Sequence, residues 1–227
     1  MENFHLFSKY AICYGVFFLL TYISKLNKGH KLFDEDGPVR NPGILIGLQL
    51  AGVLWLGILP VSIIHQPFTI IVFGKYLPEL YKVLTLYILL MVSVFMAWRL
   101  SVERFNGIIK NNGFTRLSKR FIYSYCLLRI VFLSGYEIFF RGYLLTDCVA
   151  GFGIFWAVVI NVTLYALLHV VDERKEFLAC IPFGILVCLI CIWFGEAWPA
   201  VIIHIVFSVT YEFTLSKKFS TPINVII

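Results

Sequence analysis

The most regular feature of this chain is a series of long apolar runs separated by polar segments. A helix rises 1.5 Å per residue, so about 20 mainly apolar residues are needed to cross the hydrocarbon of a bilayer. Runs of about this length occupy residues 7–24, 44–64, 82–99, 121–146, 150–171, 177–194 and 198–215. The pattern therefore predicts an all-α, polytopic membrane bundle of about seven transmembrane helices.

Two of the connecting segments are long and polar. Residues 27–42 (NKGHKLFDEDGPVRNP) are rich in turn-forming residues, and residues 101–120 are rich in Lys and Arg. A further apolar stretch, Phe68 to Phe73, is too short to cross a bilayer and is bracketed by Pro67 and Gly74. We expect it to form an interfacial or re-entrant piece.

Composition supports the membrane interpretation. Hydrophobic residues make up 60% of the chain and charged residues 14%, with a mean hydropathy of +0.86. An ordinary soluble domain has about 45–50% apolar and about 25% charged residues, so this chain lacks the polar side chains that a water-exposed surface requires. Most of the six cysteines lie inside apolar runs. Cys188 and Cys191 have no Cys or His cluster beside them, so we expect buried thiols and no disulfide framework.

The net charge of +6 does not indicate nucleic acid, because the basic residues follow a membrane pattern. With seven spans, only Lys9, Lys75 and Lys82 fall on one side, while Arg129 and Arg141 fall within spans. All other Lys and Arg residues lie on the opposite side. The positive-inside rule then places the N-terminus outside and the C-terminus in the cytoplasm. We expect an integral protein of the plasma membrane (the inner membrane of a bacterial cell), with a retained first span and no signal peptide.

Several polar residues fall inside the predicted spans, where a charged side chain costs at least about 2.5–3.5 kcal/mol. They are Glu137, Arg141, His169 and His204, with Ser208 one turn after His204. Glu137 and Arg141 are four residues apart and share a helix face, so they can pair. Structural roles are open for each: an internal ion pair, a histidine at the membrane edge, or a hydrogen-bonded packing histidine.

Taken together, these residues suit hydrolysis inside a membrane. A carboxylate and an imidazole can hold and deprotonate water, and a second imidazole can stabilise an oxyanion. An arginine beside a buried carboxylate keeps it ionised. We expect Glu137, His169 and His204 to converge on one polar cavity. The same three residues are also able to ligate a divalent metal such as zinc.

The polar residues stand in motifs that resemble those of the CPBP family, which includes the type II CAAX prenyl endopeptidases and bacteriocin-processing membrane proteases. Glu137 to Leu144 (EIFFRGYL) resembles the family's EExxxR motif, Tyr165 to His169 resembles FxxxH, and His204 to Ser208 resembles HxxxN. The resemblance covers roughly residues 134–208. It implies a family core of four helices in residues 121–216, preceded by N-terminal helices and loops in 1–120, within a single membrane domain.

By this resemblance, His169 is the water-activating histidine, while His204 and residue 208 lie on the oxyanion side. The chain departs from the family at two positions: Tyr136 replaces the first glutamate, and Ser208 replaces asparagine. A tyrosine with its usual pKa near 10 is a poor base at neutral pH. Adjacent helical residues also point about 100° apart, so Glu137 does not simply take over the role of the family's first glutamate.

The sequence leaves the function open between two interpretations. In one, the protein is a CAAX-type intramembrane endopeptidase with an altered or impaired site. In the other, it is a catalytically inactive membrane module that binds a peptide or lipidated partner or acts in a membrane complex. A transporter is a weaker third interpretation, since no inverted repeat is visible. The expected partners are membrane lipid and a membrane-embedded or lipidated peptide or protein, not nucleic acid.

Overall fold

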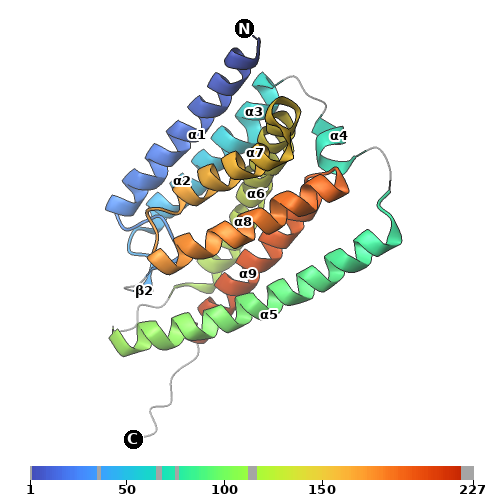
Figure 1. Ribbon diagram of the computed structural model, residues 1–227. Coiled ribbons are helices and arrows are strands. Elements are labelled where there is room, and N and C mark those ends of the chain that lie inside the picture. The colour runs from blue at the N-terminus through green and yellow to red at the C-terminus, as the bar shows by residue number, and fades with distance from the viewer. Residues whose placement is uncertain (1, 35–36, 65–67, 75–76, 112–116, 221–227) are drawn as a thin grey trace, which may run out of the picture.

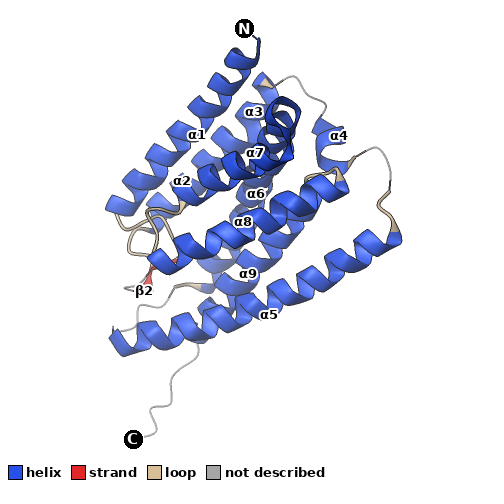
Figure 2. Cartoon of the chain, in the orientation of Figure 1, coloured by secondary structure: helices blue, strands red, loops and turns tan. Residues whose placement is uncertain are grey.

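The computed structural model describes residues 2–34, 37–64, 68–74, 77–111 and 117–220, and nearly all of this is helical (Figures 1 and 2). The helices are α1 (Glu2–Leu26), α2 (Pro42–Gly52), η1 (Val53–Ile58), α3 (Leu59–Ile63), α4 (Phe68–Phe73), α5 (Leu80–Asn111), α6 (Lys119–Glu137), η2 (Ile138–Leu144), α7 (Leu145–Leu168), α8 (Arg174–Phe194) and α9 (Trp198–Ser220), where η1 and η2 are π-helices. Two short strands, β1 (Phe33–Asp34) and β2 (Gly37–Pro38), pair antiparallel.

The apolar runs of the sequence become long helical segments. In the described residues, six segments are long and apolar enough to cross a membrane: Phe7–Leu26, Pro42–Ile63, Leu80–Ile108, Lys119–Leu168, Arg174–Phe194 and Trp198–Phe219. Five of these each contain one predicted span. The exception is Lys119–Leu168, which has 50 residues and covers the fourth predicted span and all but the last three residues of the fifth.

This long segment turns back on itself at Gly153, where φ is +78°. A positive φ suits glycine because it has no Cβ to clash with the backbone. After the turn α7 folds back along η2, and the Asn161 side-chain amide donates to the Phe140 carbonyl at 2.6 Å. The prediction of an all-α bundle of about seven spans is confirmed. The break between the fourth and fifth lies at Gly153, not at residues 147–149 as we expected.

Successive long segments run in alternating directions, so the start of α1 and the end of α9 lie at opposite ends of the bundle (Figure 1). The loop at 27–41, the α7–α8 turn at 169–173 and the last turn of α9 meet at one end. There Lys31 lies 2.9 Å from Asp172, and the Phe33 ring stacks on Phe219 at 5.2 Å. We call this the basic end of the bundle, after its lysines at positions 25, 28, 31, 217 and 218.

α6 and η2 run through the middle of the bundle, against α9 on one side and α2 and η1 on another (Figure 1). The approach to η1 is close because two glycines face each other. A Cβ built on Gly135 would lie 2.7 Å from the Gly57 Cα. Both π-helices lie beside this crossing, η1 around Gly57 and η2 three residues after Gly135. The crossing therefore fixes the position of the segment that carries Glu137.

Two peripheral helices complete the fold. The short apolar stretch Phe68–Phe73 forms the separate helix α4, and the Ala197 amide donates to the carbonyl of Ile71 in it at 3.1 Å. Pro67, which we expected to bracket this piece, and Lys75 of the charge count lie outside the described residues. α5 packs along α9 (Figure 1). Its large apolar side chains such as Tyr87 and Ile88 are exposed, as on a lipid-facing helix.

Candidate functional site

Three of the predicted site residues form one buried cluster between α6, η2 and α9. The Glu137 carboxylate is fully buried, and its Oε1 lies 2.5 Å from His204 Nδ1. Arg141 Nη1 lies 3.4 Å from Oε1 and 3.3 Å from Oε2 of the same carboxylate. The ion pair expected from the four-residue spacing is therefore present, and it joins a histidine 67 positions further along the chain.

The π-helix η2 contains most of the motif that carries this cluster. In a π-helix each backbone N–H bonds to the carbonyl five residues earlier, and such turns are frequent at functional sites. The Leu145 amide bonds to the Phe140 carbonyl in this way, and Asn161 donates to the same oxygen from α7. Asn161 is fully buried and also accepts from the Cys188 thiol at 3.3 Å. This amide holds α7 and α8 against η2, and the sequence analysis did not single it out.

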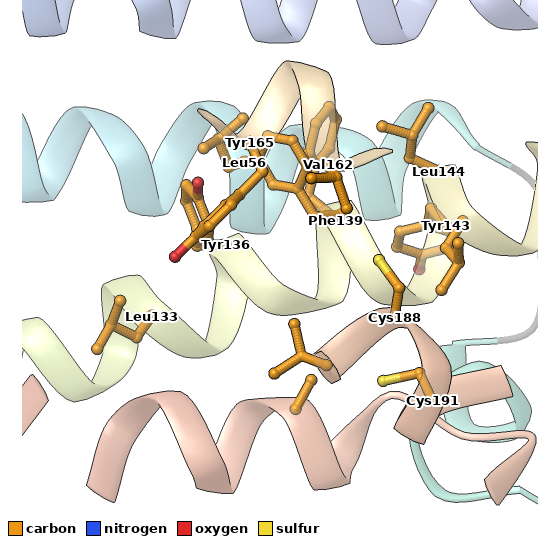
Figure 3. Packing of buried hydrophobic residues seen from close by; sticks show 14 of the residues in the cluster. Leu56, Leu133, Tyr136, Phe139, Tyr143, Leu144, Val162, Tyr165, Cys188 and Cys191 are labelled. Carbon is orange, nitrogen blue, oxygen red and sulfur yellow. The ribbon is translucent and has the colours of Figure 1, made fainter. Parts of the chain in front are cut away.

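Tyr136 and Tyr165 form the aromatic side of the cluster. Figure 3 shows the two rings near one another, with centroids 6.0 Å apart. The Arg141 guanidinium lies 4.4 Å from the centroid of Tyr165, a cation–π contact. The Tyr136 hydroxyl is buried and has no hydrogen-bond partner among the residues that the structure describes. Tyr136 therefore packs beside Glu137 and His204 through its ring, in the place where the resembling motif has a carboxylate.

His169 lies outside this cluster, at the C-terminal end of α7 and one turn after Tyr165. Its ring contacts Tyr165 with centroids 5.1 Å apart, and Tyr165 in turn contacts His204 at 6.4 Å. The hydrogen bond of His169 is with Asp172, from Nδ1 to Oδ2 at 2.7 Å. In the described part of the chain, no hydrogen bond or ion pair joins His169 to Glu137. Both histidines therefore contact the ring of Tyr165.

The environment of His169 favours its charged form. Burial lowers the pKa of the imidazole, but hydrogen bonds with Asp172 and Cys180 outweigh this effect and raise the pKa to about 9. Burial also opposes ionisation of Asp172, but hydrogen bonds with His169 and His30 and the charge of Lys31 lower the pKa of this carboxyl well below its usual range. At neutral pH the pair is therefore an imidazolium beside a carboxylate.

Ser208 belongs to a second buried polar cluster, nearer the basic end. Arg129 Nε donates to Ser208 Oγ at 3.2 Å and lies 3.7 Å from Glu212 Oε1, which accepts from the Tyr125 hydroxyl at 3.0 Å. Arg129 was expected within a span, whereas Glu212 was not among the predicted site residues. The signal was available, because Glu212 is a carboxylate inside the last span, four residues after Ser208. Ser208 thus hydrogen-bonds an arginine and is not bonded to His204.

The structure does not bring the predicted metal ligands together. Glu137 and His204 are in contact, whereas His169 bonds to Asp172. Across the described ranges, no three His, Cys, Asp or Glu side chains are grouped so that they could hold a metal ion. The residues present therefore do not fit the zinc site that the sequence allowed, and we derive no step through a metal.

The part of the chain that carries these clusters matches a known family. Residues 120–210 fit the family model described as type II CAAX prenyl endopeptidase Rce1-like. This segment is therefore similar to the Rce1-like family. The match confirms the resemblance seen in the motifs. The Rce1-like segment runs from the first turn of α6 into α9 and includes all five predicted site residues.

Helices α1 to α5 precede the Rce1-like segment. Comparison of the chain with curated proteins gives no match. The segments long and apolar enough to cross a membrane, together with the Rce1-like match, identify an integral membrane protein.

Proposed function

We propose that this protein is a membrane endopeptidase of the CAAX prenyl type, with a rearranged site that hydrolyses a lipidated peptide. The observation that carries the proposal is the 2.5 Å contact between Glu137 and His204 inside the Rce1-like segment. A carboxylate that accepts from one imidazole nitrogen fixes the tautomer and leaves the other nitrogen as a base. Arg141 keeps the carboxylate ionised beside it.

The two histidines are suited to complementary roles. The proposed roles differ from those that the motif resemblance implies, because His204 and not His169 contacts Glu137. In the proposed reaction, His204 takes a proton from water while the water oxygen attacks the scissile carbonyl carbon. His169, held as a cation beside Asp172, donates a proton to the leaving amine when the C–N bond breaks. Histidines whose environments differ in this way are typical of acid and base partners. The Tyr165 ring, which contacts both histidines, contributes to the wall of the site.

A second candidate function is a non-catalytic module that binds a lipidated partner. One feature favours it: Tyr136 replaces the motif's first carboxylate, and its buried hydroxyl has no hydrogen-bond partner within the described ranges. His204, the base of the proposed reaction, is also buried, so water must reach it for hydrolysis to occur. Such a module would keep the Glu137–Arg141 pair only to hold α6 and η2 in place.

Proteolysis by the purified protein separates the two candidates. In lipid nanodiscs, the native protein is expected to release the C-terminal tripeptide from a prenylated peptide that ends in a CAAX sequence, as measured by mass spectrometry. Glu137→Gln and His204→Gln should both reduce the rate to background. Glu103→Gln, which removes only a surface carboxylate paired with Arg99, is the matched control and should cleave like the native chain. No cleavage by well-folded native protein would favour the binding module.

We also propose that the basic end of the bundle faces the cytoplasm and that the protein lies in the plasma membrane. Single cysteines at Lys110 and Lys218, in a background without the six native cysteines, are expected to react with an impermeant maleimide only after cells are permeabilised. A cysteine at Glu79, beside the start of α5 at the other end of the bundle, should react in intact cells. The reverse labelling pattern would overturn the orientation.

A further inference from the structure

His169 ends α7 in a compact group of charged side chains. Its Nδ1 lies 2.7 Å from Asp172 Oδ2, three residues later in the α7–α8 turn. The Asp172 side chain is only 4% exposed, whereas the His169 side chain is 30% exposed. A carboxylate fixed in the protein therefore faces an imidazole that is partly open. This difference in exposure is expected if the carboxylate supports the ring and the ring meets a ligand.

Asp172 is itself held from the other side. Lys31 Nζ lies 2.9 Å from its Oδ1, and His30 Nε2 lies 3.3 Å from the same oxygen. Lys31 also bonds to Glu176 in the first turn of α8. Each carboxylate oxygen of Asp172 thus has its own partner, Oδ2 with the imidazole and Oδ1 with the loop. Because both oxygens are occupied, the carboxylate has little freedom to turn away from the ring.

The residues that hold Asp172 come from a part of the chain that the family match does not include. His30 and Lys31 lie in the loop between α1 and β1, whereas the Rce1-like segment begins at residue 120. The loop is anchored by its own packing, since Leu32 and Phe33 are buried against Ile108, Leu215 and Phe219. The position of His30 and Lys31 is therefore set by the fold.

We propose that Asp172 is the positioning residue for His169, fixing its ring with Nδ1 toward the carboxylate, and that His30 and Lys31 hold Asp172 in this role. Carboxylates that accept from the second nitrogen of a functional imidazole set its tautomer and orientation in the same way. The inference rests on the proposed endopeptidase function, in which His169 is the proton donor. It assigns to the site a residue outside the recognised motifs, together with a loop outside the matched segment.

The kinetic test compares carboxylates of the same cluster. With the prenylated peptide, Asp172→Ala is expected to lower kcat about 10–100-fold with little change in KM, the usual size of an orienting contact. Asp172→Glu should recover part of the loss. Glu176→Gln is the matched control, because Glu176 bonds to Lys31 without touching His169, and it should stay close to native. Equal losses in Asp172→Ala and Glu176→Gln would overturn the proposal, as would a rise in kcat in Asp172→Ala.

A second measurement tests the positioning when no peptide is cleaved. Nitrogen-15 NMR of labelled histidines, with His169→Gln to assign the signal, reports the proton on each ring nitrogen. The native protein and Glu176→Gln are expected to show a slowly exchanging Nδ1 proton that is lost in Asp172→Ala. An Nδ1 proton that exchanges equally fast in all three proteins would overturn the positioning role. Absence of cleavage with this proton present would instead count against the proposed function alone.

Discussion

Replacing Arg141 with leucine is expected to lower the free energy of unfolding by about 3–5 kcal/mol. Arg141 is only 2% exposed, and its guanidinium lies 3.3 Å from the fully buried Glu137 carboxylate. Leucine keeps much of the volume but leaves that carboxylate buried with only His204 beside it. An uncompensated buried charge is costly because no water can solvate it. Denaturant titration of the protein in detergent, followed by tryptophan fluorescence, measures the loss.

Two comparisons make this prediction specific to the buried pair. The double variant Glu137→Gln, Arg141→Leu should recover much of the lost stability, since the leucine then no longer faces a charge. Arg99→Leu removes an exposed arginine paired with Glu103 on α5 and should change the stability by less than about 1 kcal/mol. If Arg141→Leu alone were as stable as Arg99→Leu, the buried pair would not stabilise this fold.

Gly135→Ala is expected to destabilise the bundle by about 1–3 kcal/mol, as overpacking of a close-packed site does. The added Cβ would lie 2.7 Å from the Gly57 Cα, which is a backbone atom and cannot rotate away. α6 and η1 must therefore move apart. Because η2 follows directly on α6, the Glu137–His204 contact should weaken as well.

The matched control for this substitution is Gly47→Ala in α2. No atom lies within 4 Å of the Cβ that it would add, and the position is exposed. Alanine is favoured over glycine in a helix interior by roughly 0.5–1 kcal/mol, so Gly47→Ala should raise stability slightly. Thermal unfolding in detergent compares the two variants with the native protein. A loss of stability in both, or in neither, would contradict the account of the Gly57–Gly135 crossing.

The sequence was most informative where one physical effect dominates. Spans could be predicted because a bilayer requires long apolar helices, and the Glu137–Arg141 pair followed from their spacing on one helix. The exact position of the turn at Gly153 could not be predicted, because residues 151–153 contain two glycines within an apolar run. Only the packing of α7 back onto η2 determines which of the two glycines forms the turn. The site was harder, because its contacts join residues far apart in the chain.

His169 and Glu212 show this limit. The pattern around His169 was compatible with a role beside Glu137, but the choice of partner depended on where the α7–α8 turn placed Asp172. In the sequence, Asp172 is a polar residue just after the predicted span. Nothing in the sequence indicated that His30 and Lys31 would contact it. Glu212 was overlooked because it follows the HxxxN-like motif, and its Arg129 partner lies 83 positions earlier in the numbering. Such long-range pairing is set by packing.

The loop that holds Asp172 means that the boundary of the family match is not a boundary of folding. A fragment starting at residue 119 would contain the whole Rce1-like segment and yet lack His30 and Lys31. It would also lack Phe33, whose ring covers Phe219 at the end of α9. The first half of the chain, which contains no family motif, thus contributes charged partners for Asp172 and apolar side chains that pack on the second half. Sequence drift in this loop and in the α7–α8 turn should consequently be correlated among the proteins that share this arrangement.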